Sequence, residues 1–248
     1  MKNIINTLAF ILILCTFAFP QTPSGADVLK QIDKNLLLDK AVTTTTMIIH
    51  GRAGTRSVKA KSWIEGRDKA FVEYTDPPRE KGKKMLKLGD QLWNYIPEPT
   101  DRIITISGHL LRQSVMGSDL SYEDITENKK LVELYNAKVT GSEKLDNRDC
   151  YVVELTAKQE DITYYSRKLW VDKERWLPLK EERYARSGKP LKRSEILEVT
   201  RIDNRWYPKR MVYHDLMQNG EGTEYVIESI DFHANIPESQ FTKAALKK

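Results

Sequence analysis

The sequence SVKAKSWIE at residues 57–65 alternates apolar and polar side chains. Val58, Ala60 and Ile64 share one side of an extended chain, while lysines and a glutamate share the other. This pattern predicts a β-strand with one buried face and one face in water. The same alternation returns at residues 69–75, so we expect the two segments to be neighbouring strands of one sheet.

Further extended segments lie on both sides of this pattern, separated by turn-forming residues. The hairpin dipeptide Gly89-Asp90 joins residues 84–88 to residues 91–96. The other predicted strands are residues 43–49, 102–106, 137–141, 150–157, 164–171, 178–185, 194–202, 210–215 and 223–232. No strand–helix–strand rhythm appears, so the spacing predicts a long antiparallel meander rather than a doubly wound parallel sheet.

Three segments depart from this alternation. Residues 24–27 resemble a helix capping box, and apolar residues then follow at helical spacing: Val28, Leu29, Ile32 and Leu36. Residues 108–116 and 123–134 are also rich in apolar side chains, and we predict helical pieces that lie across the sheet. A large curved sheet with so few helices would leave an apolar cavity on its concave face.

Residues 1–20 have the pattern of a signal peptide. Lys2 precedes an apolar run at residues 4–19, which is shorter than the roughly 20 residues of a membrane span. An uncleaved anchor and a lipid-anchored form acylated at Cys15 are the alternatives, and Leu14 disfavours the second because a small residue is normally needed there. We therefore expect residues 21–248 to form a single exported domain.

Composition excludes several classes of protein. The chain has 248 residues, a formal charge of +5, 30% charged and 40% hydrophobic residues, which argues against disordered, collagen-like and multi-span membrane proteins. The positive charge is diffuse, so it suits transient contact with an anionic membrane surface and does not imply nucleic-acid binding. Without residues 1–20, Cys150 is the single cysteine, and we expect it to be a small buried side chain in a strand.

Catalytic and cofactor-binding motifs are missing from the sequence. The four histidines are far apart and show no metal-ligand spacing, and there is no nucleophile elbow, phosphate-binding loop or dinucleotide fingerprint. We therefore expect no enzyme activity, no cofactor and no metal. Carboxylates brought together by folding leave an exported hydrolase as an alternative, with Asp119 and Glu123 as its candidates.

Several short motifs resemble one known family. They are KLGDQLWNYIP at residues 87–97, MGSDLSYED at 116–124, WVD at 170–172 with WLP at 176–178, and IP at 236–237 with FT at 241–242. Together they resemble the outer-membrane lipoprotein-sorting proteins, the LolA-like group. The resemblance implies a mainly β (α+β) fold, an unclosed antiparallel β barrel of about eleven strands with helices covering its concave apolar face.

The same resemblance implies a function. A member of this group would be a periplasmic carrier that binds acyl chains of lipoproteins or lipids and moves them toward the outer membrane. An inner-membrane transporter and an outer-membrane acceptor would be its partners. The chain is longer than the prototypical sorting chaperone and lacks a clear counterpart of its lid arginine, which favours a lipid or lipoprotein carrier of unspecified cargo over a lipoprotein chaperone. A lipid- or lipoprotein-sensing or transporter-associated module without transfer activity is the alternative.

Our candidates for lining the cavity combine aromatic residues of the predicted sheet with apolar residues of segment 108–116. They are Phe71, Trp93, Tyr95, Leu110, Leu111, Val115 and Met116. Each could equally be an ordinary core residue. Met116 is the strongest candidate, since a flexible thioether adapts to ligands of variable shape.

Overall fold

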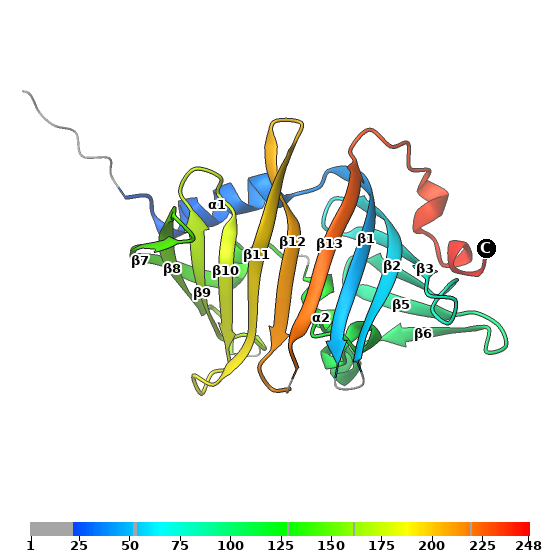
Figure 1. The fold of residues 1–248 in the computed structure, drawn as a ribbon. Helices are drawn as coiled ribbons and strands as arrows, with labels where there is room; N and C mark the ends of the chain where they lie inside the picture. Colours follow the sequence, from blue (N-terminus) through cyan, green and yellow to red (C-terminus); the bar gives the residue numbers. More distant parts are fainter. Residues whose placement is uncertain (1–21, 52–53, 128, 161, 219) are drawn as a thin grey trace, which may run out of the picture.

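One continuous antiparallel sheet dominates the computed structural model, which describes residues 22–51, 54–127, 129–160, 162–218 and 220–248 (Figure 1). The predicted signal peptide and Cys15 lie outside the described residues. The strands are β1 Lys40–Gly51, β2 Gly54–Glu65, β3 Lys69–Asp76, β4 Lys84–Leu88, β5 Gln91–Ile96, β6 Arg102–Ile106, β7 Tyr135–Leu145, β8 Arg148–Ala157, β9 Ser166–Asp172, β10 Pro178–Tyr184, β11 Pro190–Ile202, β12 Arg205–Asp215 and β13 Gly222–Asp231.

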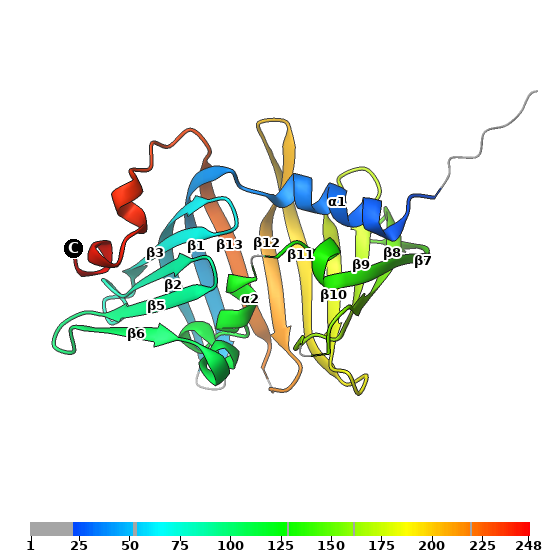
Figure 2. The same ribbon diagram turned by 180° about the vertical axis from the view of Figure 1, so that it is seen from behind.

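Two meanders build this sheet, one from β1 to β6 and one from β7 to β13. Their strands follow the order β6-β5-β4-β3-β2-β1-β13-β12-β11-β10-β9-β8-β7, so β1 and β13 join the two meanders. The edge strands β6 and β7 are consecutive in the chain. The segment that links them crosses the concave side of the curved sheet (Figure 2). We call this segment, residues 107–127 and 129–134, the roof.

The predicted fold class is confirmed, with one correction. The sheet is unclosed and antiparallel with few helices, but it has thirteen strands among the described residues rather than about eleven. Every segment predicted as a strand overlaps one of them. The largest shift is in β12, which starts at Arg205 and runs through Pro208, because an irregular register opposite Pro208 tolerates the missing N–H.

The roof consists of short turns rather than longer helices. Its elements are η1 Gly108–Arg112, η2 Val115–Gly117, α2 Tyr122–Thr126 and α3 Leu131–Leu134. Met116 and Gly117 have positive φ values of 52° and 67°, a conformation that no α-helix can continue. The predicted helical pieces are therefore present but broken.

Helix α1, Gly25–Leu36, lies across the concave side near strands β7 to β12 (Figure 2). The Ser24 side chain caps it by accepting from the backbone N–H of Asp27 at 3.2 Å. The predicted apolar face, from Val28 to Leu36, packs against β7, β8 and β9. Asn35 Nδ2 donates to Arg175 O at 2.8 Å, which fixes the far end of the helix on the β9–β10 turn.

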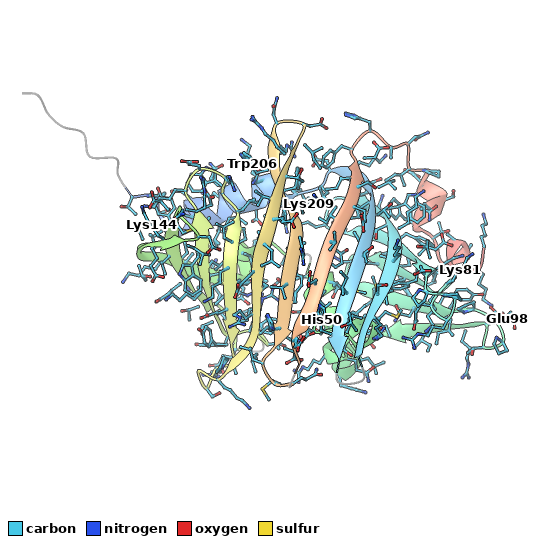
Figure 3. The ribbon with its side chains drawn as sticks, in the orientation of Figure 1. His50, Lys81, Glu98, Lys144, Trp206 and Lys209 are labelled. Carbon is cyan, nitrogen blue, oxygen red and sulfur yellow. The ribbon has the colours of Figure 1, made fainter. Side chains whose placement is uncertain are left out.

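The C-terminal segment covers part of the outer face of the sheet. Its turns, η3 Glu238–Phe241 and η4 Lys243–Lys247, pack apolar side chains onto β3, β4 and β5. On β12 the outer face carries charged side chains such as Lys209 (Figure 3). The C-terminal segment thus covers β3 to β5 on the outer face, and the open space of the protein lies on the concave side.

Candidate functional site

An apolar cavity of about 180 Å³ lies between the concave face of the sheet and the roof. Strands β1 to β4 and β13 form its wall, and three roof residues close it: Val115, Leu120 and Ile125. The wall residues are Thr45, Met47, Val58, Ala60, Ser62, Ile64, Ala70, Val72, Tyr74, Met85 and Tyr225. We call this cavity the apolar chamber. Its wall carries no charged side chain, so it can accept an aliphatic chain but no ion.

The roof is fixed to the wall strand β2 at the position of its sharpest turn. Arg56 donates through Nη2 to Met116 O. This contact holds the backbone where Met116 and Gly117 reverse direction. Ser121 and Asp124 then form a reciprocal capping box that starts α2. The local sequence therefore sets the path of the roof over the chamber.

Asp119 attaches the roof to the strands on the other side. Its carboxylate accepts from Thr223 Oγ1 at 2.6 Å and from the backbone N–H of Asp215 at 2.9 Å. Lys192 Nζ donates to Asp119 O at 2.6 Å. Both carboxylate oxygens are thus engaged in holding the roof on β12 and β13.

Asp124 makes a second, buried attachment. Its Oδ1 accepts from Arg183 Nη1 and from the Tyr164 hydroxyl, both at 2.7 Å, and its Oδ2 accepts from the backbone N–H of Ser121 at 2.7 Å. Burial alone would raise the pKa of Asp124, but Arg183 and the Ser121 N–H outweigh burial and lower it. The carboxylate is therefore ionised and bound inside the protein.

Arg183 belongs to a larger network of buried charges. Its Nη2 donates to Glu181 at 2.9 Å, and Arg167 donates to Glu181 at 3.2 Å and to Glu127 of the roof at 2.6 Å. Burial opposes the ionisation of Glu181, yet the two arginines lower its pKa to about 2. The network holds its arginines in pairs with carboxylates, as buried charges require.

A second cavity of about 400 Å³ adjoins the apolar chamber. Both cavities share Ile64, Ala70 and Ile125 as lining residues, so they meet at one wall. The further lining residues are Ile32, Asp33, Leu36, Leu37, Leu38, Gly66, Arg67, Lys69, Lys87, Glu127, Lys129, Leu131, Arg167, Leu169, Pro178, Glu181 and Arg183. We call it the charged chamber, because charged groups of both signs line it beside the apolar face of α1.

The structure divides the seven residues predicted from the sequence into three groups. Val115 lines the apolar chamber, and Met116 packs in the side-chain cluster around it. Leu110 and Leu111 pack beside that chamber against a cluster formed by Met85, Leu92 and Ile106. Phe71, Trp93 and Tyr95 lie together in the cluster under the C-terminal segment. Contact of these seven side chains with cargo stays a prediction.

Sequence reasoning missed most of the chamber wall, although a signal was present. The alternation at residues 57–65 and 69–75 places Val58, Ala60 and Tyr74 on one face of their strands, and these residues line the apolar chamber. The pattern does not reveal which face is concave. Aromatic size favoured Phe71 and its neighbours instead, and these residues fill the opposite face.

Cys150 is fully buried in β8, as the sequence predicts, and burial raises the pKa of its thiol to about 11. Among the residues that the structure describes, no group of histidine, cysteine and acidic side chains could hold a metal ion. Within the same ranges, no helix is long and apolar enough to cross a membrane.

Three solved bacterial structures are similar to this chain over nearly their whole length. A DUF1329 family protein from Desulfovibrio piger is 24% identical with a TM-score of 0.82, covering 90% of this chain and 97% of its own. A domain from Vibrio parahaemolyticus, described as an outer membrane lipoprotein-sorting protein, is 24% identical with a TM-score of 0.79. The match covers 90% of this chain and 98% of that domain. A LolA superfamily protein from Nitrosomonas europaea is 23% identical with a TM-score of 0.74, covering 90% and 100%.

These likenesses define the class: the chain has the LolA-like fold of the lipoprotein-sorting proteins. The model of a family described as an uncharacterized protein matches residues 66–248, most of the chain, and the protein belongs to that family. No curated protein matches the chain. The expectation of a LolA-like fold is thereby confirmed.

Proposed function

We propose that this protein is a periplasmic carrier that binds acyl chains of lipoproteins or lipids in the apolar chamber. The observation that carries the proposal is an uncharged cavity between a concave sheet and a roof of short turns. Exposing an acyl chain to water costs about 0.8 kcal/mol per methylene. A carrier therefore needs an apolar cavity that opens at one side, and it needs no catalytic group.

The positions at which charged side chains attach the roof would determine where the cavity can open. Asp119 and Asp124 hold the roof through side-chain contacts to β10, β12 and β13. Between these attachments the roof contacts the wall through apolar side chains, led by Leu120. An entering chain would displace these apolar side chains, and its own methylenes would replace their contacts with the wall.

The proposal includes partners and a direction. The carrier would receive cargo from an inner-membrane transporter and deliver it to an acceptor in the outer membrane, after export through a cleaved signal peptide. The structural neighbour from Vibrio parahaemolyticus, described as an outer membrane lipoprotein-sorting protein domain, supports this role. A stable protein partner without transfer of cargo between membranes would instead identify the sensing or transporter-associated module.

A cavity-filling substitution tests the proposal. Ala60 is 6% exposed and lines the apolar chamber, so Ala60→Phe places a ring in the space that cargo would fill. We expect retention of acylated cargo, measured by native mass spectrometry, to fall at least tenfold. Ala244→Phe, at an exposed position of η4, is the matched control and should keep its cargo.

Folding of both variants is checked by their thermal unfolding. Equal cargo retention in folded Ala60→Phe and in the unmodified protein would contradict the placement of the acyl chain in the apolar chamber. The same assay applied to Met116→Glu and Leu111→Glu tests the predicted roof residues, each of which should lose cargo while the sheet still folds.

A further inference from the structure

Lys87 is a buried lysine on the wall of the charged chamber. It lies on β4 and is 6% exposed. Its Nζ donates one hydrogen bond, to Arg67 O at 2.7 Å. Within the described residues no carboxylate oxygen lies within 4 Å of it, although Asp68 and Asp90 are near enough to favour its charged form. Burial outweighs both and lowers the pKa of Lys87.

The other buried cations around the chamber are paired, which sets Lys87 apart. Arg167 and Arg183 each contact two carboxylates in the buried network. An ammonium has three donors, and a buried charge without a counterion is costly. A lysine kept at such a place, facing a cavity, is suited to bind an anion that enters from outside.

Arg67 is a second cation that lines the charged chamber. Its Nη2 donates to Asp33 Oδ1 at 2.6 Å, while its Nε is buried and has no hydrogen-bond partner. Asp33 Oδ2 is likewise buried and unpartnered, and burial raises the pKa of this carboxyl. Polar atoms in proteins are rarely left in this state, so the wall of the charged chamber is incompletely hydrogen-bonded among the described residues.

The carboxylates of the chamber do not cancel the charge of Lys87. Glu127 and Glu181 are paired with arginines, and Asp33 is paired with Arg67. Lys87 therefore contributes a positive charge beyond what the lining carboxylates neutralise. A small anion beside Lys87 would accept from the ammonium donors that the Arg67 carbonyl leaves free.

We propose that the charged chamber binds the anionic headgroup of a single-chain amphiphile whose acyl chain lies in the apolar chamber, with Lys87 as the headgroup ligand. This inference rests on the proposed carrier function and names its cargo class. The two chambers adjoin at Ile64, Ala70 and Ile125, so one amphiphile would pass between these three side chains with its headgroup in one chamber and its chain in the other. The apolar chamber, at about 180 Å³, is smaller than the 300–1,000 Å³ of common ligand pockets, which favours one chain over two.

Binding of matched amphiphiles to the full exported chain tests the inference. The probes are hexadecanoate and lysophosphatidylglycerol, which are anionic, and monohexadecanoylglycerol, which is neutral. Displacement of a fluorescent acyl probe gives each affinity. We expect Lys87→Met to weaken both anionic probes about tenfold to a hundredfold, the range of a charge-assisted hydrogen bond, and to leave the neutral probe unchanged.

Lys84→Met is the matched control, because it removes one positive charge from β4 at a side chain that contacts Tyr95 on the outer face. It should bind all three probes like the unmodified chain. Equal loss in both lysine variants, or equal affinity of the unmodified chain for anionic and neutral probes, would overturn the headgroup site and leave the carrier intact. Failure of every probe to bind would overturn the carrier itself. Displacement by inorganic phosphate alone at equal concentration would assign the site to a free anion instead.

Discussion

Asp124→Asn should destabilise the protein through the roof. The aspartate side chain is 3% exposed and accepts from Arg183, Tyr164 and the Ser121 N–H at 2.7 Å each. Asparagine keeps the shape and one acceptor oxygen but removes the charge. The neutral amide accepts weaker hydrogen bonds than a carboxylate does, so the native state loses the charge-assisted part of its interaction with the three partners.

The magnitude follows from those three contacts, because the fourth, from Ser121 Oγ at 2.7 Å, can be kept when the hydroxyl accepts from the asparagine amide. A hydrogen bond to a charged group contributes about 1.5–3 kcal/mol and a neutral one about 0.5–1.5 kcal/mol, so the change costs about 1 kcal/mol per contact and about 3 kcal/mol in all. Arg183 keeps Glu181 as a counterion at 2.9 Å, which holds the loss below the roughly 3–5 kcal/mol of a fully broken buried pair. For a chain of this size, about 3 kcal/mol lowers the melting temperature by about 6–12 °C.

Urea unfolding followed by circular dichroism measures this loss, and Glu123→Gln is the control. Glu123 precedes Asp124 in α2 and makes no ion pair among the described residues, so its amide variant should unfold within about 0.5 kcal/mol of the parent. A loss below about 1 kcal/mol in Asp124→Asn, or a loss equal to that of Glu123→Gln, would refute the assignment of Asp124 as the buried attachment of the roof.

Three further predictions concern pH, the buried cysteine and the first helix. The pKa of Glu181 is lowered from 4.5 to about 2, so its contribution to stability is complete above pH 4.5 and is lost as the pH falls toward 2. The unfolding free energy of Glu181→Gln should therefore fall less steeply with decreasing pH than that of the parent. Cys150 is fully buried, and the pKa of its thiol is about 11. A thiol reagent at pH 8 should therefore label it only after denaturant is added. Rapid labelling of the native protein would contradict its burial in β8. A Cβ on Gly25 would lie 2.3 Å from Ala137 O, a backbone atom that cannot move aside freely. Gly25→Ala should therefore lower the unfolding free energy by about 1–3 kcal/mol. An unchanged value in urea unfolding would contradict the close packing of α1 on β7.

The strands were predictable because alternation is a local property. Residues 84–88 and 91–96 are strands with the predicted bounds, and the hairpin dipeptide Gly89-Asp90 lies at their turn. The amphipathic stripe of α1 was equally readable from Val28 onward. The broken roof was not readable, because the positive φ of Met116 depends on its contact with Arg56, which is 60 residues away in sequence.

The face of each strand that lines the site could not be predicted from spacing alone. Ala60 and Phe71 both face a packed layer, one under the roof and the other under the C-terminal segment. Choosing between them requires knowledge of how the sheet curves and where Phe241 packs. Lys87 appears in the sequence as one more polar residue of an alternating strand, and its burial becomes visible only when the roof and α1 are in place.

The content of the apolar chamber is the most direct test of the carrier. The full chain would be expressed with its own N-terminus, purified gently from a periplasm and weighed by native mass spectrometry, and the bound species would be extracted with organic solvent and identified. The account predicts an added mass that the solvent releases as an acylated molecule. A mass equal to that of the bare chain, together with no binding of added phospholipid or acylated peptide, would contradict it.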